Sequence, residues 1–136
     1  MKPESRFIAR LHKRLPSEVY AEHTHNPYRR GIPDVYYEAV GGCLWAEYKY
    51  LPRASKVIHP LKLLSAHQQQ WLLRAIRNNR RCAVIIGSPG GVIVLPGLSW
   101  NCADITPHWS PIQEAIGFIT QQVIHETPRT QSERAD

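Results

Sequence analysis

The chain has 136 residues, 43% of them hydrophobic and 21% charged, which is ordinary for a soluble protein of one compact domain. No apolar run approaches the length of a membrane span, and the charged N-terminus is unlike a secretory signal, so we expect neither a membrane protein nor a secreted one. Three cysteines without a CxxC pair exclude a disulfide framework and a zinc ribbon. They are expected to be small buried hydrophobes in a cytoplasmic protein (in the host cell's cytoplasm for a virus-encoded one).

The net charge of +6 is unevenly distributed along the chain. Residues 1–81 hold 15 of the 17 Lys and Arg and 6 of the 11 Asp and Glu, which gives +9, and residues 82–136 carry −3. The stretch from Tyr48 to Arg81 has eight basic residues and no carboxylate between them. Such a one-sided run is a candidate phosphate-binding surface, and a solvated basic face is the alternative.

The first half of the chain predicts one helix and three strands. Hydrophobic periodicity favours an amphipathic helix over Pro3–Leu15, which Pro16 ends. Three strand-like segments follow, separated by a polar loop at 26–31 and by a Gly-Gly pair: Glu18–His25, Pro33–Val40 and Cys43–Tyr50.

The second half predicts two helices and two strands. After a basic loop at 51–63, the periodicity indicates a helix over Ser65–Asn79, and a closing helix is expected over Pro111–His125. Two apolar strands, Arg81–Gly87 and Gly91–Leu95, lie between these helices, and the Pro- and Trp-rich segment 96–110 has no assignment. The sequence thus predicts a single α/β domain over 1–126, with a mixed sheet flanked by helices, and a flexible polar tail at 127–136.

The Gly-Gly pair allows the hairpin geometry to be written out. If Gly41 and Gly42 form a two-residue turn, Asp34 lies opposite Lys49 and Tyr36 opposite Glu47. Because side chains alternate along a strand, one face carries the polar members of both strands: Asp34, Tyr36, Glu38, Trp45, Glu47 and Lys49. The other face is apolar and suits a core. Asp34 and Glu47 then form a diagonal pair about 7–8 Å apart, within reach of one cation.

Two carboxylates beside a lysine are the groups that phosphodiester hydrolysis needs. Oxygen ligands suit Mg²⁺, which polarises a phosphate and lowers the pKa of a bound water. A neighbouring lysine can orient that water or neutralise developing negative charge. The alternative is a cross-strand Asp34–Lys49 salt bridge on a solvated face.

Two short motifs resemble those of a nuclease family. Gly31-Ile32-Pro33-Asp34 followed by Glu47-Tyr48-Lys49 resembles the PD-(D/E)xK signature, and Leu64-Ser65-Ala66-His67-Gln68 with Trp71 is similar to a helix start of its VRR-NUC branch, to which archaeal Holliday-junction resolvases are related. The resemblance covers most of the chain, from about residue 4 to residue 95. It implies a restriction-endonuclease-like αβββαβ core.

The resemblance also implies roles for individual residues. Asp34, Glu47 and the backbone carbonyl of Tyr48 would be metal ligands, and Lys49 would be the catalytic lysine. Glu4, on the apolar stripe of the first helix, would complete the metal site, unless it only complements the helix dipole. A further catalytic position falls on Gln68, as a phosphate contact or a support of the metal ligands. Ser65-x-x-Gln68 is also a capping box, and both roles can coexist.

The implied activity is that of an Mg²⁺- or Mn²⁺-dependent DNA endonuclease, selective for junctions or branched DNA, that needs no organic cofactor and forms a homodimer. The phosphate contacts would come from the basic loop and from one side of the following helix: Arg53, Lys56, Lys62, Arg74, Arg77 and Arg81. A general or site-specific DNA nuclease, an RNA nuclease, a non-catalytic nucleic-acid-binding module and an inhibitor or adaptor of another protein are the alternatives.

Overall fold

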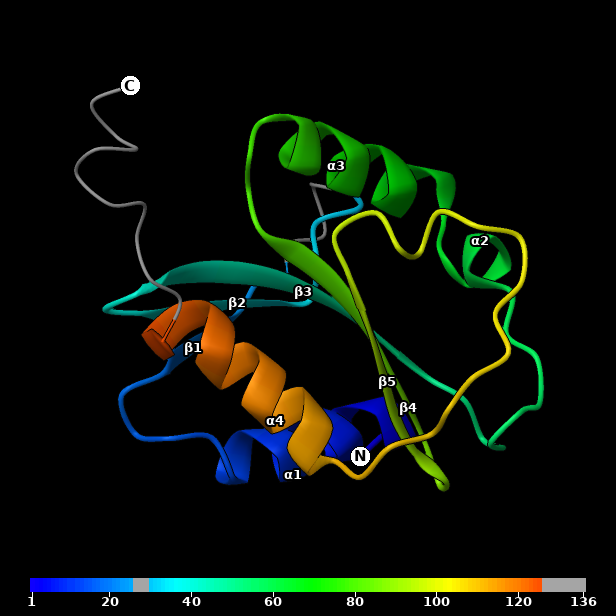
Figure 1. Ribbon diagram of the computed structural model, residues 1–136, viewed down its shortest axis with the longest axis horizontal. Coiled ribbons are helices and arrows are strands. Elements are labelled where there is room, and N and C mark those ends of the chain that lie inside the picture. Colours follow the sequence, from blue (N-terminus) through cyan, green and yellow to red (C-terminus); the bar gives the residue numbers. More distant parts are fainter. Residues whose placement is uncertain (26–29, 126–136) are drawn as a thin grey trace.

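The computed structural model describes residues 1–25 and 30–125 as a five-stranded mixed sheet between two layers of helices and loops (Figure 1). The strands lie side by side in chain order and are β1 (Tyr20–His23), β2 (Val35–Ala39), β3 (Gly42–Tyr50), β4 (Cys82–Ser88) and β5 (Gly91–Pro96). Only β3 and β4 pair in parallel, across the connection that holds α3, and the other neighbours are antiparallel. Every residue of β4 is buried, as expected for a strand covered on both faces.

The helices are distributed over both faces of the sheet. They are α1 (Pro3–Lys13), α2 (Pro60–Leu63), α3 (Ala66–Arg77) and α4 (Gln113–Thr120), which continues as a π-helical segment, η1 (Gln121–His125). Figure 1 shows α1 and α4 below the sheet and α2 and α3 above it. The order α1-β1-β2-β3-α3-β4 confirms the restriction-endonuclease-like αβββαβ core, with β5 and α4 added after it.

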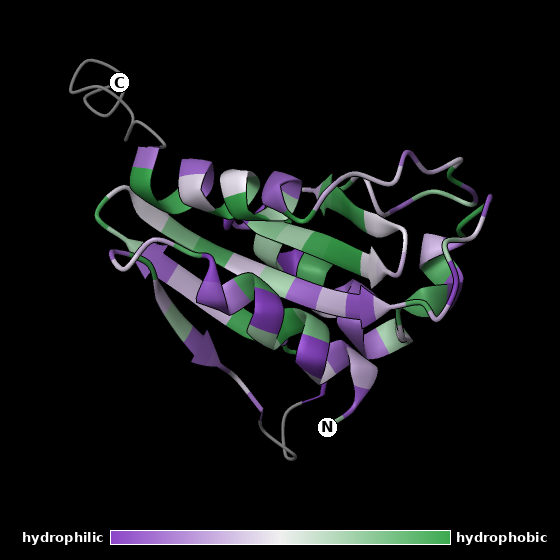
Figure 2. Cartoon of the chain, turned by 90° about the horizontal axis from the view of Figure 1, so that it is seen from below, coloured by the Kyte–Doolittle hydropathy of each residue, from purple (hydrophilic) through white to green (hydrophobic). Residues whose placement is uncertain are grey.

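Each face of the sheet has its own hydrophobic core. The first core lies between the sheet and α1 and α4, and includes Phe7, Leu11, Tyr37, Tyr48 and Ile119. The second lies between the sheet, α3 and the 97–110 segment, and includes Leu72, Ile86 and Trp100. Figure 2 shows hydrophobic residues concentrated in the middle strands, with hydrophilic residues on the outer sides of the helices.

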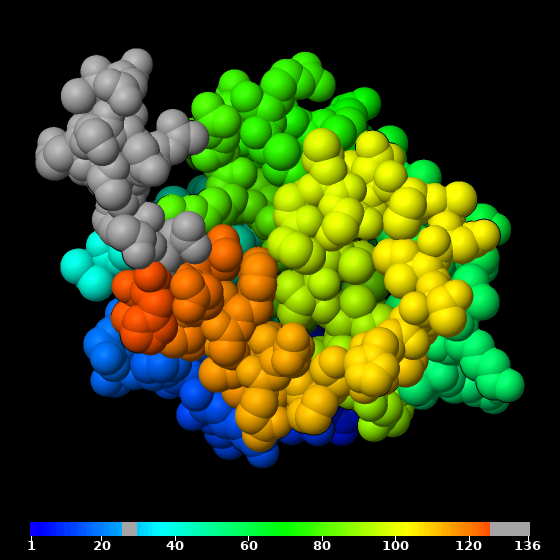
Figure 3. All heavy atoms as spheres, in the orientation of Figure 1, coloured from blue at the N-terminus to red at the C-terminus, as the bar shows by residue number. Residues whose placement is uncertain are grey.

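The 97–110 segment, for which the sequence predicts no element, is part of the cover of the second core. It is attached by two isolated β-bridges, Ile58–Ile105 and Val92–Ser110, and it buries Trp100. Figure 3 shows this segment, in yellow, spread over the molecule beside α3.

The predicted strands and helices are present, but several of their limits differ. The first helix ends at Lys13 rather than Leu15, and the first strand is Tyr20–His23 rather than Glu18–His25. The loop expected at 51–63 ends in the short helix α2, which Pro60 begins. The helix expected to reach Asn79 ends at Arg77, because Asn79 adopts a left-handed conformation with φ of 64°. The closing helix begins at Gln113 rather than Pro111.

The predicted hairpin register was wrong by two residues, while the assignment of faces was right. Ala39 pairs with Gly42, so the turn is Val40-Gly41, and Tyr36 lies opposite Trp45 instead of Glu47. Gly41 is held by its N–H, which donates to the carbonyl of Val123 in η1 at 2.7 Å. A shift of two residues keeps every side chain on the same face, because the side-chain period of a strand is two.

No helix within the described ranges is long and apolar enough to cross a membrane. All three cysteines are free, and only Cys82 is fully buried, so the expectation of burial was wrong for Cys43 and Cys102, which are half-buried. The tail at 127–136 and most of the loop expected at 26–31 lie outside the described residues.

Candidate active site

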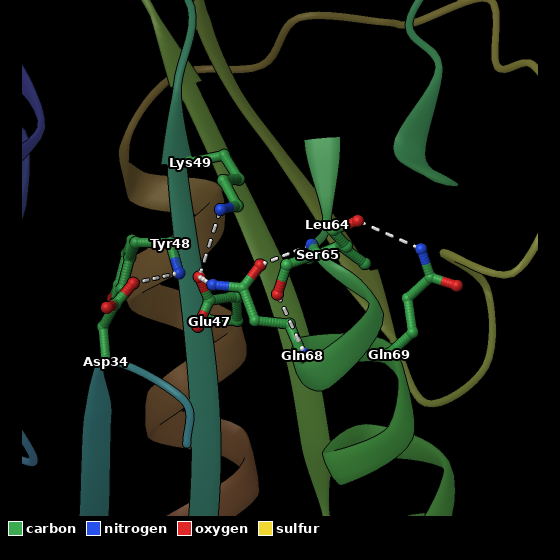
Figure 4. A network of polar contacts seen from close by, with 8 residues as sticks. All are labelled: Asp34, Glu47, Tyr48, Lys49, Leu64, Ser65, Gln68 and Gln69. Atoms are coloured by element: carbon green, nitrogen blue, oxygen red, sulfur yellow. Dashed lines mark hydrogen bonds and ion pairs between the residues drawn. The ribbon is translucent and has the colours of Figure 1, made fainter. Parts of the chain in front are cut away.

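The candidate site lies where β3 extends past the first residue of β2. Asp34 directly precedes β2, and its Oδ2 accepts a hydrogen bond from the backbone N–H of Tyr48 at 2.9 Å. Glu47 and Lys49 point from β3 toward the start of α3, as Figure 4 shows. The three residues predicted from the sequence are therefore brought together, although Asp34 lies beside the backbone of Tyr48 and not opposite Lys49.

Glu47 is almost fully enclosed, with only 2% of its surface exposed. Its Oε2 accepts a hydrogen bond from Gln68 Nε2 at 3.0 Å and lies 3.6 Å from Lys49 Nζ. Its Oε1 is buried and has no hydrogen-bond partner among the described residues. The ion pair of Lys49 is thus with Glu47, which differs from the Asp34–Lys49 bridge considered as the alternative. A buried carboxylate oxygen without a partner is costly unless a cation or a proton compensates it.

Gln68 forms the predicted capping box and also contacts Glu47. The Ser65 side chain accepts from the Gln68 backbone N–H at 3.1 Å, and Gln68 Oε1 accepts from the Ser65 N–H at 2.9 Å. This capping box occupies the oxygen of the Gln68 side-chain amide, so its nitrogen is left facing Glu47 (Figure 4). The start of α3 therefore fixes one oxygen of the buried carboxylate.

Burial and neighbouring carboxylates raise the pKa values of two acidic residues in the site. Burial, followed by the nearby charge of Asp34, raises the pKa of Glu47 to about 9, although Lys49 opposes the shift. Glu4, at the start of α1, is half-buried, and burial followed by the charge of Asp34 also raises its pKa. Glu4 thus faces the site as its place on the apolar stripe of α1 predicted.

The backbone carbonyl of Tyr48 also lies on the open side of β3. The N–H groups of Trp45 and Leu51 donate to β4 and its flanks, and the N–H of Tyr48 points the other way, toward Asp34. The N–H and C=O of one strand residue point to the same side. Because β2 pairs with β3 only as far as Ala46, none of the five described strands covers this carbonyl.

The donor set fits a hard divalent cation. The described ranges, 1–25 and 30–125, contain no group of three or more His, Cys, Asp and Glu side chains placed to hold a metal. A cation here would have to be bound by Asp34, Glu47, the Tyr48 carbonyl and water, with Glu4 nearby. Mg²⁺ is commonly held by one or two carboxylates and several waters in this way, and the unpartnered oxygen of Glu47 is available to it.

The predicted phosphate contacts separate into two groups. Five are exposed and lie along the loop after β3 and on the outer side of α3: Arg53, Lys56, Lys62, Arg74 and Arg77. Arg81 differs, because α3 ends before it and its Nη1 donates to the carbonyl of Gln122 in η1 at 2.5 Å. The interpretation of Arg81 as a continuation of the helical row was wrong.

A second basic surface was not predicted from the sequence. We call it the α1 groove, and it consists of two adjoining hollows that share Pro3 and Tyr50. The one beside Glu4 and Lys49 measures about 520 Å³, and the other, about 480 Å³, is lined by Arg6, Arg10 and Lys13. The sequence signal for this surface was the spacing of Arg6, Arg10 and Lys13, which are four and three residues apart and so lie on one side of a helix.

No protein-family model and no curated protein sequence matches the chain, so the VRR-NUC branch stays a prediction. Among solved structures, the chain is similar to Hjc of Archaeoglobus fulgidus, a Holliday junction resolvase from an archaeal hyperthermophile. The two are 19% identical, with a TM-score of 0.47 over 68% of this chain and 74% of the other. A similarity of this size does not assign an activity to the chain.

Proposed function

We propose that the protein is a divalent-metal-dependent endonuclease that hydrolyses phosphodiester bonds in DNA. The observation that carries the proposal is the enclosed carboxyl group of Glu47 beside Asp34 and Lys49, one oxygen of which has no hydrogen-bond partner in the part of the chain that the structure describes. A buried, partly unpaired acid next to another carboxylate destabilises the fold, so its presence points to a functional site.

Asp34, Glu47 and the Tyr48 carbonyl would hold Mg²⁺ or Mn²⁺, and Glu4, which lines the same hollow as Lys49, would complete the set. The chemistry that the ion supplies when bound is polarisation of the scissile phosphate and a lowered pKa of an attacking water. For the ion to enter, Glu47 must lose the proton that its raised pKa favours at neutral pH.

Lys49 and Gln68 complete the chemistry from the two sides of Glu47. The Lys49 ammonium lies 3.6 Å from Glu47 and can neutralise charge that develops on the phosphate oxygens. Gln68 holds Glu47 Oε2 through its amide, which leaves Oε1 for the ion. The capping box makes this arrangement part of the helix start, so it does not depend on the bound substrate.

The finer part of the proposal is a preference for branched DNA. Exposed basic residues approach the site from two directions, along the α1 groove and along the loop and outer side of α3. Duplex arms that diverge from a branch point would meet both surfaces, whereas one straight duplex would follow one of them. A homodimer, implied by the motif resemblance, remains a prediction that sedimentation velocity can check.

The decisive experiment incubates the protein with linear duplex, single-stranded, flapped and four-way-junction DNA, with and without Mg²⁺ or Mn²⁺. We expect metal-dependent cleavage, fastest on branched DNA, that is abolished in Asp34→Asn and Glu47→Gln. Glu38→Gln removes an exposed carboxylate from the same face of the sheet and should cleave normally. Cleavage by Glu47→Gln at the wild-type rate would refute the assignment, and binding of DNA without cleavage under any of these conditions would favour a non-catalytic module.

A further inference from the structure

Three aromatic side chains form a continuous row on the face of the sheet that carries Glu47. We call it the aromatic row: the ring of Tyr36 in β2 lies 4.7 Å from that of Trp45 in β3, which lies 5.1 Å from that of Trp71 in α3. All three are only half-buried, and Trp45 and Trp71 pack against the second core while part of each ring stays exposed to solvent.

The row borders a hollow of about 750 Å³, and the charged residues that line it within the described ranges are all arginines. Trp45 and Trp71 form part of its wall, together with Ile32, Asn78 and three arginines, Arg30, Arg74 and Arg80. The Arg74 guanidinium lies over the Trp71 ring, 5.2 Å from its centroid. A smaller hollow of about 280 Å³ shares Trp45 and Arg80 with the first and reaches Tyr36, where its lining includes the acidic Glu22.

The hollow is next to the proposed site. Trp45 precedes Glu47 by two residues on the same face of β3, and Ile32 precedes Asp34 by two. Two residues of a strand span about 6.6 Å, so a group stacked on Trp45 lies close to a phosphate held at Glu47.

The rings of Trp45 and Trp71, which lie among arginines, suit one class of ligand. Unpaired nucleobases stack on aromatic side chains while basic residues contact the phosphates between them. Bases inside a duplex already stack on one another and offer no free face. The hollow therefore matches a segment of single-stranded DNA and does not match an intact duplex.

We propose that the aromatic row binds unpaired nucleotides adjacent to the scissile phosphate. The inference rests on the proposed function, since it specifies which DNA is presented to that site. A substrate of this kind has a duplex arm on the basic surfaces and an unwound or single-stranded segment over Tyr36, Trp45 and Trp71. The α3 arginine Arg74 would then hold the phosphate of the stacked nucleotide.

The test measures binding without metal, so that cleavage does not enter the result. The ligands are a short oligothymidylate and a duplex of equal length. Trp71→Leu should weaken oligothymidylate binding by about 5- to 150-fold and leave duplex binding unchanged, and Trp71→Phe should retain most of the affinity. Trp109→Leu is the matched control, because Trp109 is half-buried like Trp71 but lies on the 97–110 segment, where its Nε1 donates to the carbonyl of Ser55.

A second measurement uses the wild-type protein and is independent of any folding defect in the variants. Photo-crosslinking with a 5-iodouracil oligonucleotide, followed by peptide mapping, should label Tyr36, Trp45 or Trp71. Unchanged oligothymidylate binding in Trp71→Leu, an equal loss for both ligands, or crosslinks confined to other peptides would each overturn the proposal. If the row binds as expected and no DNA is ever cleaved, the proposed function fails and the binding surface stands.

Discussion

Replacing Glu47 with Gln should stabilise the metal-free protein at neutral pH, although it removes the activity. In the folded protein the pKa of Glu47 is raised to about 9 from its ordinary value of 4.5, with burial the largest cause. Because the pKa of Glu47 is higher in the folded state, protonation of this group stabilises the folded protein. The stabilisation is fully present below pH 4.5 and is lost as pH rises toward 9. At pH 7 the difference from the unfolded value is about 2.5 pH units, which at about 1.4 kcal/mol per unit is at most about 3.5 kcal/mol.

Gln cannot ionise, so it avoids this cost, and its side-chain oxygen can still accept from Gln68. We therefore expect the free energy of unfolding of Glu47→Gln to exceed that of the wild type by about 1–3 kcal/mol at pH 7, and to equal it near pH 4. Urea denaturation in the presence of a chelator measures both values. Glu18→Gln, at an exposed carboxylate, is the control and should show no such pH-dependent gain.

A loss of stability in Glu47→Gln at pH 7 would contradict this reasoning. It would mean that Glu47 is ionised and stabilised by its ion pair with Lys49, so that its pKa is not raised. A gain of the same size at pH 4 and pH 7 would also contradict it, because the gain would then come from packing and not from ionisation.

Three further results are expected. Binding of Mg²⁺ near neutral pH should release about one proton per ion as Glu47 deprotonates, which calorimetry in buffers of different ionisation enthalpy detects, and the release should vanish in Glu47→Gln. Lys49→Ala should still bind the ion but cleave about 10²–10³-fold more slowly in single-turnover assays, and loss of ion binding with retained cleavage would mean that Lys49 supports the ion instead of the reaction. Arg77→Ala should reduce the slope of log affinity for duplex DNA against log salt by about one unit, whereas Arg81→Ala, at a side chain bonded to Gln122, should leave it unchanged.

The sheet and its polar face could be predicted because they depend on local patterns. Alternation of side chains along β2 and β3 assigned Glu47 and Lys49 to one face, and the assignment survived a register error of two residues. The register itself depends on contacts that are distant in sequence. The turn is packed against η1, where the Gly41 N–H donates to Val123, and no pattern within the hairpin indicates that contact.

Burial of the site was not predictable for a similar reason. The sequence allowed Glu47 to lie on a solvated face, and its enclosure comes from α3, whose first turn brings Gln68 over β3. The cover formed by 97–110 has no regular periodicity to detect. Arg81 followed Arg74 and Arg77 at helical spacing, and only the left-handed conformation of Asn79 separates it from them.

The Gly31–Asp34 motif and the Leu64–Gln68 motif contact each other at Gly31, and this contact gives a last prediction. Gly31 has φ of +85°, and a Cβ there would lie 2.3 Å from the carbonyl oxygen of His67, next to Gln68 in the first turn of α3. The loop before Asp34 and the start of α3 thus touch backbone to backbone, and this contact sets the distance from Asp34 to the Gln68–Glu47 pair. Gly31→Ala should lower the free energy of unfolding by at least about 1–2 kcal/mol and reduce cleavage as well, because α3 has to move. Gly97→Ala is the matched control: Gly97 also has positive φ, at +59°, but no atom of residues 1–25 or 30–125 lies within 4 Å of its added Cβ, so stability should fall and cleavage should not. Equal cleavage rates for the two variants, measured on the same branched DNA, would show that the contact at Gly31 does not position the site.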